Sequence, residues 1–336
     1  MPTTSWGSVE EILGDATDVE PMDTVGVSGS RLERIRVDGR PLVVKRLDPR
    51  TDWTMRALGD LGCYTLQLWE RGLLDRLPDS FLQPIVAAGP DPGRPEGSRR
   101  VVLVMEDIGR WLVADGDEPI SEELNTRFLT HMAELQAAFW DAGPELEVTP
   151  PLHRYLVLSP WTALAEASLG GDEADHAIAP LIGRGLDELA TVAPRAAAVV
   201  VPLAWDPGPL VTALEETPQT FLHGDWKLFN LGSDDRGRTI LLDWEMPGRG
   251  PGAAEVAWYL AINCRRLPVA KETCLELYRN ALETHGIDTE PWWERQLDLA
   301  LLGGLVQFGW EKALSGYDDE LAWWEDAAVR GARWLS

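Results

Sequence analysis

The sequence contains little cysteine and little histidine. Its three cysteines, Cys63, Cys264 and Cys274, are too few and too scattered to form a disulfide framework or a thiolate zinc site. Its five histidines show no HExxH spacing, the usual arrangement of a zinc site built from histidine. We therefore expect a fold that depends on a hydrophobic core, without disulfides or structural zinc.

Long apolar runs are also missing. Residues Met1–Val9 lack both a basic region and an apolar run, so the sequence predicts no signal peptide. The most apolar stretch, Leu297–Trp310, contains Asp298 and Gln307 and is too short to span a bilayer. These features predict a cytoplasmic protein without a membrane partner.

Basic residues are few relative to acidic ones. The chain has 30 Lys and Arg against 55 Asp and Glu, which gives a formal net charge of −25. Nucleic acids are not expected as partners, because binding to their phosphates needs an excess of positive charge. The charge favours a cationic small molecule instead. A length of 336 residues, 45% of them apolar, predicts a folded protein of about two domains, as a monomer or simple homodimer.

The first hundred residues have the pattern of antiparallel strands. Arg31–Val37 alternates apolar and charged residues, and an Asp-Gly pair, a strong hairpin signal, separates it from the apolar run Leu42–Leu47. Upstream, Glu20–Val27 is expected to be the first strand of the same meander, followed by the small-residue turn Ser28–Ser30. Lys45 lies inside the otherwise apolar third strand.

The pattern changes further along the chain. Thr51–Leu74 has helical periodicity, two more strands are expected at Phe81–Ala88 and Val101–Met105, and helices dominate from Glu122 onward. The sequence thus predicts an α+β fold with two lobes. They are a small antiparallel β-rich lobe (residues 1–105), a hinge (106–110) and a larger, mostly helical lobe (111–336).

One loop carries the clearest chemical pattern. It offers Asp225 and, five residues later, Asn230; the apolar run Thr239–Leu242 then ends at Asp243. A tight hairpin between the two segments would bring these three polar side chains together. Carboxylate and amide oxygens suit Mg²⁺, which binds proteins through few carboxylates and takes further ligands from substrate phosphates. The sequence therefore predicts a hard-oxygen site for Mg²⁺.

These residues also fit a known pattern, H-G-D-x-x-x-x-N. It is matched by His223, Gly224, Asp225 and Asn230, and Asp243 follows where a second metal-binding Asp is expected. With these motifs the chain resembles the aminoglycoside phosphotransferase family, within the wider protein-kinase-like fold. The resemblance implies a bilobal kinase that uses Mg²⁺ and ATP, with GTP left open.

The resemblance covers most of the chain and implies nucleotide contacts in the first lobe. Ser28 and Gly29 lie where the family has its phosphate-covering turn. Lys45 lies where a strand lysine pairs with the α- and β-phosphates. Glu106 and Ile108 lie in the hinge, whose backbone would hold adenine.

Two positions depart from the family pattern. The usual Gly-Asp-Pro-x-x-Asp-Leu-Ala stretch is altered at Gly250–Ala257, where Glu255 would replace the structural Asp. Kinases also pair the strand lysine with a helix glutamate, and the sequence offers no clear counterpart. Glu70 is the first choice and Asp60 the second.

The resemblance assigns roles to the loop. Asp225 would accept the proton of an acceptor hydroxyl, and Asn230 and Asp243 would hold Mg²⁺. His223 is expected to brace the loop rather than act as a base. Lys227 stands two residues after Asp225, as in protein kinases; it would either neutralise charge on the γ-phosphoryl group or be a surface lysine.

The implied function is transfer of the γ-phosphoryl group of ATP to a hydroxyl of a small molecule. Candidate acceptors are an aminoglycoside, an amino sugar or a choline-like amine, bound by the helices after Glu122 and the Trp-rich end of the chain. Glu245 would add to the metal or substrate shell. The alternatives are a nucleotide-binding pseudokinase, suggested by the missing helix glutamate and by Glu255, and a binding protein that takes no nucleotide.

Overall fold

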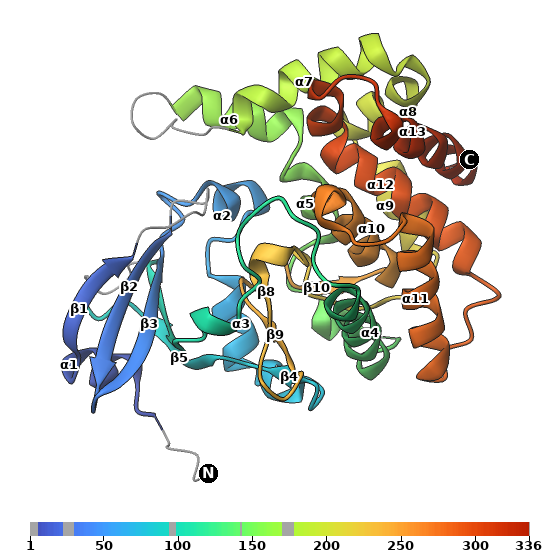
Figure 1. Cartoon of the computed structure of the whole chain (residues 1–336). Helices are drawn as coiled ribbons and strands as arrows, with labels where there is room; N and C mark the ends of the chain where they lie inside the picture. The colour runs from blue at the N-terminus through green and yellow to red at the C-terminus, as the bar shows by residue number, and fades with distance from the viewer. Residues whose placement is uncertain (1–5, 23–29, 94–98, 142, 170–177, 336) are drawn as a thin grey trace.

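The computed structural model describes residues 6–22, 30–93, 99–141, 143–169 and 178–335, and it has the two lobes that the sequence predicts (Figure 1). The helices and strands of the first lobe are α1 (Val9–Gly14), β1 (Thr17–Met22), β2 (Arg31–Val37), β3 (Arg40–Leu47), α2 (Trp53–Leu58), α3 (Tyr64–Glu70), β5 (Ile85–Pro90) and β6 (Val101–Glu106). Those that build the second lobe are β4 (Phe81–Leu82), α4 (Glu122–Ala138), α5 (Pro151–Leu156), α6 (Pro160–Leu169), α7 (Ala179–Val192), α8 (Pro194–Trp205), α9 (Gly208–Glu215), β7 (Thr220–Leu222), β8 (Leu231–Ser233), β9 (Thr239–Leu241), β10 (Gly248–Gly250), α10 (Gly252–Ile262), α11 (Lys271–Thr284), α12 (Trp293–Leu314) and α13 (Asp319–Gly331).

The first lobe is an antiparallel sheet of five strands in the order β1-β2-β3-β6-β5. Alternate residues of β3 point to opposite faces of this sheet. Val44 lies on the face that α1 covers, in a cluster with Val9 and Ile12. Lys45 therefore points to the other face, toward α2, α3 and the second lobe. The first strand ends at Met22, and the rest of the stretch predicted for it lies outside the described residues.

The helix predicted at Thr51–Leu74 is divided in two. Asp52 caps the start of α2 through a bond from the Met55 N–H (3.1 Å), and Gly59 ends this helix in the left-handed region (φ 68°). Cys63 also has a positive φ of 61° before α3 begins. The helical character predicted for this stretch is therefore confirmed in two pieces, because two residues with positive φ separate α2 from α3.

The strand predicted at Phe81–Ala88 is also divided. Pro84, which has no N–H to donate, separates β4 from β5. β4 pairs in parallel with β9, in a small sheet with β8, whereas β5 pairs with β6 in the first lobe. The chain thus passes into the second lobe and returns before it reaches the predicted hinge.

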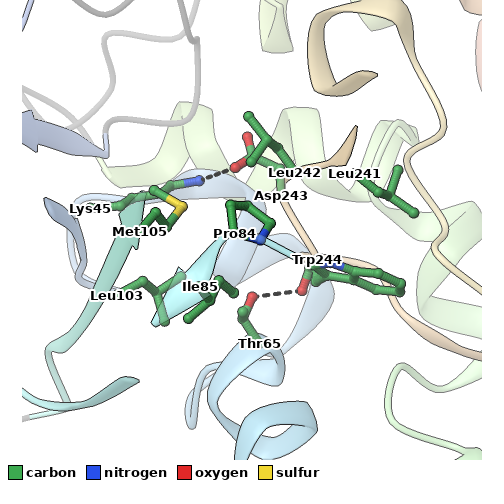
Figure 2. A pocket seen from close by; sticks show the side chains of 10 residues that line it. All are labelled: Lys45, Thr65, Pro84, Ile85, Leu103, Met105, Leu241, Leu242, Asp243 and Trp244. Carbon is green, nitrogen blue, oxygen red and sulfur yellow. Dashed lines mark hydrogen bonds and ion pairs between the residues drawn. The ribbon is translucent and has the colours of Figure 1, made fainter. Parts of the chain in front are cut away.

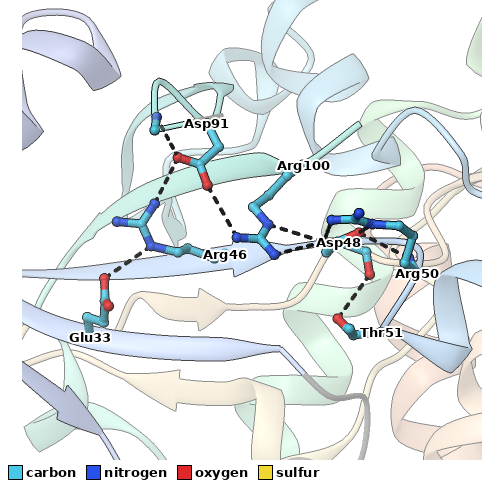
Figure 3. Close-up of polar contacts among 8 residues, drawn as sticks. Glu33, Arg46, Asp48, Arg50, Thr51, Asp91 and Arg100 are labelled. Atoms are coloured by element: carbon cyan, nitrogen blue, oxygen red, sulfur yellow. Dashed lines mark hydrogen bonds and ion pairs between the residues drawn. The ribbon is translucent and has the colours of Figure 1, made fainter. Parts of the chain in front are cut away.

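Ion pairs to the buried carboxylates of Asp48 and Asp91 hold the end of β3 (Figure 3). Arg46 binds Asp91 (3.1 Å), and Arg100 binds both Asp91 (3.8 Å) and Asp48 (2.9 Å). Arg50 also binds Asp48, and its hydrogen bonds hold the pKa of that carboxyl well below its usual range. These contacts attach the end of the strand that carries Lys45 to the loop end of the β5–β6 hairpin.

The second lobe is built around α12, which is buried along most of its length and packs against α7, α10 and α13. Short strands β7 and β10 pair with each other beside the β8–β9 hairpin. Arg56 of α2 and Glu166 of α6 join the lobes through two hydrogen bonds of 3.1 and 2.6 Å. In the described part of the chain no single helix has the length and apolar character of a membrane span, although the bent pair α8 and α9 together meets that test.

Candidate active site

The loop with the H-G-D-x-x-x-x-N pattern runs from β7 to β8. Strand β8 pairs with β9 in antiparallel register, with Leu231 opposite Leu241. At the end of this hairpin the Leu242 N–H donates to the Asn230 carbonyl (2.9 Å). Asn230 and Asp243 therefore lie side by side at the end of the hairpin, where the sequence analysis expects them.

Asp225 is buried and held from three sides. The Asn230 amide donates to its Oδ2 (2.9 Å), and the Lys227 ammonium lies 2.6 Å from the same oxygen. The Trp258 indole N–H donates to Oδ1 (3.2 Å). With both oxygens engaged, the carboxylate has a fixed orientation in an environment that stabilises its charge.

Glu255 supports this loop from α10. Its carboxylate accepts the backbone N–H groups of His223 (3.0 Å) and Gly224 (2.6 Å). Burial raises the pKa of Glu255 to about 7, although these two donors act in the opposite direction. Glu255, at the position where the family pattern has its structural Asp, therefore holds the loop through two backbone hydrogen bonds.

His223 braces the loop, as the sequence predicts. Its Nε2 lies 2.8 Å from the Leu242 carbonyl, and its Nδ1 accepts the Asp225 N–H (3.2 Å). Burial lowers the pKa of His223 to about 4, so the ring is neutral with its proton on Nε2. Both ring nitrogens are occupied, and the side chain is fully buried. It is therefore not placed to act as a base.

Lys45 reaches across from the first lobe to the segment that follows β9. Its ammonium donates to Asp243 Oδ1 and to Glu245 Oε1, each at 2.9 Å. Figure 2 shows Lys45 and Asp243 meeting at one end of a pocket between the lobes. The pocket is lined by Lys45, Thr65, Pro84, Ile85, Leu103, Met105, Leu241, Leu242, Asp243 and Trp244. It is thus a narrow, mostly apolar slot with a charged end.

The charged groups at this end keep their charge at neutral pH. Burial acts to lower the pKa of Lys45, but Asp243 and Glu245 outweigh it and raise that pKa. Burial likewise opposes the charge of Lys227, yet the neighbouring Asp225 raises its pKa. For Asp243, Lys45 and Lys227 more than offset burial and hold the pKa below its ordinary value. The site is therefore a set of ion pairs.

The predicted adenine and phosphate contacts are only partly described. Ser28 and Gly29 lie outside the described residues. The Glu106 N–H donates to the Pro84 carbonyl (2.9 Å), and the Ile108 carbonyl accepts from the Trp111 N–H (2.9 Å). An adenine ring would therefore have to use the Glu106 carbonyl or the Ile108 N–H. The roles of Glu106 and Ile108 stay predictions.

The predicted partner of Lys45 is wrong. Glu70 ends α3 with its side chain exposed, and Lys45 is paired with Asp243 and Glu245 instead. Asp60, the second choice, accepts the Tyr64 N–H (2.8 Å) at the start of α3. The choice of Glu70 assumed one helix across this region, and the left-handed residues before α3 change the direction in which its side chain points.

Sequence reasoning missed Trp258, which binds the Asp225 carboxylate. Trp258 follows Glu255 by three residues on α10, so the two side chains share a face of the helix. The signal was therefore available once Glu255 had been assigned to the loop. Phe308 of α12 packs edge-on against the Trp258 ring, with 4.8 Å between ring centroids.

The raised pKa of the buried Asp60 can be tested through the pH dependence of stability. Burial raises its pKa to about 6, and the charge of Glu245 adds to this shift. An acid with a raised pKa stabilises the fold below its unfolded pKa, and this stability is lost as pH rises through the folded pKa. Asp60→Asn keeps an acceptor for Tyr64 but does not ionise. As pH rises from 4 to 7, the free energy of unfolding of the wild type should decrease. The decrease should be about 1–3 kcal/mol smaller in Asp60→Asn.

Urea titrations at several pH values in this interval measure the difference directly. Glu70→Gln on the exposed end of α3 is the matched control, and it should follow the wild type. Equal pH dependence of Asp60→Asn and the wild type would show that Asp60 does not carry a raised pKa.

Comparison with models of protein families shows which family the chain belongs to. Residues 25–294 match the model of the phosphotransferase enzyme family (APH), so the chain belongs to this family. The protein is therefore a phosphotransferase, with the two-lobed fold described above. A search of curated proteins gave no significant match.

Several solved structures are similar over nearly the whole chain. Choline kinase LicA from Streptococcus pneumoniae is 14% identical, with 97% of this chain and 96% of that chain covered and a TM-score of 0.49. A thermostable mutant of aminoglycoside phosphotransferase APH(4)-Ia, in a complex with ADP and hygromycin B, is 15% identical (97% and 96% covered, TM-score 0.47). An aminoglycoside phosphotransferase from Alicyclobacillus acidocaldarius is 16% identical (99% and 96% covered, TM-score 0.44). At these identities and TM-scores the likeness says nothing about the acceptor.

Proposed function

We propose that the protein transfers the γ-phosphoryl group of ATP to a hydroxyl group of a small, positively charged molecule. The observation that carries the proposal is the arrangement around Asp225, a buried carboxylate held by Asn230, Lys227 and Trp258. Asp225 belongs to the same site as the Lys45–Asp243 ion pair. Lys227 binds Asp225, and the charge of Asp243 also raises the pKa of Lys227. A base and a charged phosphate-binding end are thus combined in one site.

The donor set suits Mg²⁺. The Asn230 Nδ2 donates both of its hydrogen bonds to Asp225. The Oδ1 of Asn230 is therefore left as a metal ligand beside the Asp243 carboxylate. Within the described residues no group of three His, Cys, Asp or Glu side chains could hold a metal ion, so Mg²⁺ would need further ligands from phosphates and water. When bound, Mg²⁺ supplies positive charge to the transferring phosphoryl group.

The residues of the chain then have separate tasks. Lys45 binds phosphate oxygens at the charged end of the slot, and the apolar lining excludes water around the base of the nucleotide. The acceptor hydroxyl lies against Asp225. As its oxygen bonds to the γ-phosphorus, the bond from that phosphorus to the β,γ-bridging oxygen breaks, ADP leaves, and the hydroxyl proton moves to the Asp225 carboxylate. Lys227 neutralises charge beside the base.

A cationic acceptor is supported by the net charge of −25, since an acidic protein attracts positively charged ligands. The direct test is a screen of hydroxylated amines, amino sugars, neutral sugars and nucleosides with Mg-ATP, read as the mass gain of one phosphoryl group. Phosphorylation of neutral sugars or nucleosides only would contradict the cationic acceptor.

The pseudokinase alternative depended on two features of the sequence. Glu255 does hold the catalytic loop, through both of its carboxylate oxygens. Lys45 does have two acidic partners, Asp243 and Glu245, although neither is on a helix. Neither feature now favours an inactive protein. Hydrolysis of ATP or transfer to an acceptor, rather than nucleotide binding alone, distinguishes the two functions.

Nucleotide binding gives a second prediction. Mg-ATP at millimolar concentration should raise the melting temperature of the wild type by mass action. EDTA should remove part of this rise, and Asp243→Ala should abolish the Mg²⁺-dependent part, because the variant lacks the carboxylate beside Asn230. The measurement is a thermal melt with ATP, with and without Mg²⁺.

The matched control is Asp235→Ala, since Asp235 is in the same hairpin with a side chain that is 80% exposed. It should show the full effect of Mg²⁺. An unchanged wild-type melt with Mg-ATP would refute the assignment of the nucleotide site.

A further inference from the structure

In the protein-kinase arrangement, the strand lysine that binds phosphates is held by a glutamate from the neighbouring helix. Here the corresponding helices use their buried acids elsewhere. Asp52 accepts the Ser30 hydroxyl (3.1 Å) and caps α2, and Asp60 accepts the Tyr64 N–H at the start of α3. Glu70 is exposed. The acids of α2 and α3 thus accept hydrogen bonds from other groups or face solvent, although Asp52 lies near enough to Lys45 and Glu245 for their charges to act on its pKa.

The segment after β9 supplies two acids to Lys45 instead. The Glu245 N–H donates to the Asp243 carbonyl (2.8 Å), and Asp243 has a left-handed φ of 59°. This three-residue turn brings the side chains of Asp243 and Glu245 to the same ammonium group. The Glu245 side chain is the better shielded of the two, with 14% exposed against 35% for Asp243.

Helix α3 still takes part, but through a hydroxyl group. The Thr65 Oγ1–H donates to the Trp244 carbonyl (2.8 Å), and both groups are buried (Figure 2). Trp244 is the residue between Asp243 and Glu245. The helix therefore holds the turn that carries the acids, in place of carrying an acid itself.

We propose that Glu245 takes the place of the helix glutamate and positions Lys45 for the α- and β-phosphates of the nucleotide. This rests on the proposed function. The two acids would have different roles. Asp243 lies beside Asn230 and can bind a cation, whereas Glu245 holds the Lys45 side chain in place. Glu245 is thus a positioning residue, which acts through Lys45.

A test without metal separates this role from metal binding. Glu245→Gln keeps the shape and removes the charge, and Glu70→Gln is the matched control on α3. We expect Glu245→Gln to weaken the affinity for ADP in EDTA by about tenfold, and Glu70→Gln to leave it unchanged. Lys45→Met should weaken it at least as much. The double variant Lys45→Met/Glu245→Gln should be no weaker than Lys45→Met, because Glu245 acts through the lysine.

Other outcomes overturn the proposal. Additive losses in the double variant would mean that Glu245 acts independently of Lys45. Unchanged ADP affinity, with a higher Mg²⁺ requirement at saturating ATP, would make Glu245 a metal ligand only. If Glu245→Gln does not fold, Glu245→Asp, which keeps the charge, replaces it with the same criteria. Wild-type protein that binds neither ADP nor Mg-ATP would refute the proposed function itself, whereas normal wild-type binding with an unaffected variant refutes only this inference.

Discussion

Asp225→Asn should fold, bind Mg-ATP within about tenfold of the wild type and lose at least about a hundredfold in turnover, the scale of a general base. The substitution removes the group that takes the proton of the acceptor hydroxyl. It also turns one carboxylate oxygen into an amide that faces a donor, either the Trp258 indole or the Asn230 and Lys227 groups. Such a mismatch costs about 1–3 kcal/mol, less than the usual total stability of about 5–15 kcal/mol.

The experiment measures nucleotide affinity and turnover on one preparation, with the acceptor found by the screen. Retained turnover with normal binding would remove Asp225 as the base. Loss of both would make it a structural or metal-binding residue. A melting temperature close to that of the wild type is the check that the loop still folds.

Lys227→Ala should have the second largest effect. Its ammonium lies 2.6 Å from Asp225, with the side chain 30% exposed, so it can also contact a phosphoryl group placed beside the base. Removing a preorganised charge of this kind costs about 2–4 kcal/mol of transition-state stabilisation, or about 30- to 1000-fold in turnover. ADP lacks the γ-phosphoryl group, so the affinity for Mg-ADP should change by less than about threefold.

Steady-state turnover and Mg-ADP titration on the same variant distinguish the two hypotheses for Lys227. A turnover within twofold of the wild type would identify it as a surface lysine that only accompanies Asp225. An equal loss in ADP affinity would instead place it at the α- or β-phosphate.

The parts of the site that the sequence predicts are those encoded locally. Asp225 and Asn230 are five residues apart in one loop, and a single hairpin brings Asp243 to them, so spacing alone indicates their meeting. Lys45 could be placed on the third strand from the apolar run around it, and its role came from the resemblance to the family. His223, the first residue of the loop pattern, was expected to brace the loop.

The contacts that the sequence did not predict join distant elements. Glu245 meets Lys45 only because β3 and the end of β9 face each other across the lobes. Glu70 was a wrong prediction because periodicity says nothing about an interruption by residues of positive φ, such as Cys63. The contact of Trp258 with Asp225 depends on the packing of α10 against the loop, and the three-residue spacing from Glu255 indicates it only once Glu255 is known to hold that loop.

The path of the chain around Pro84 restricts how the two lobes can move relative to each other. Strand β4 belongs to the small sheet of the second lobe, and the Glu106 N–H is bonded to the Pro84 carbonyl. The two places where the chain passes between the lobes are thus tied together as one pivot. Figure 1 shows α2 and α6, which the Arg56–Glu166 pair joins, at the other end of the boundary. Any opening of the lobes about this pivot would have to separate Arg56 from Glu166.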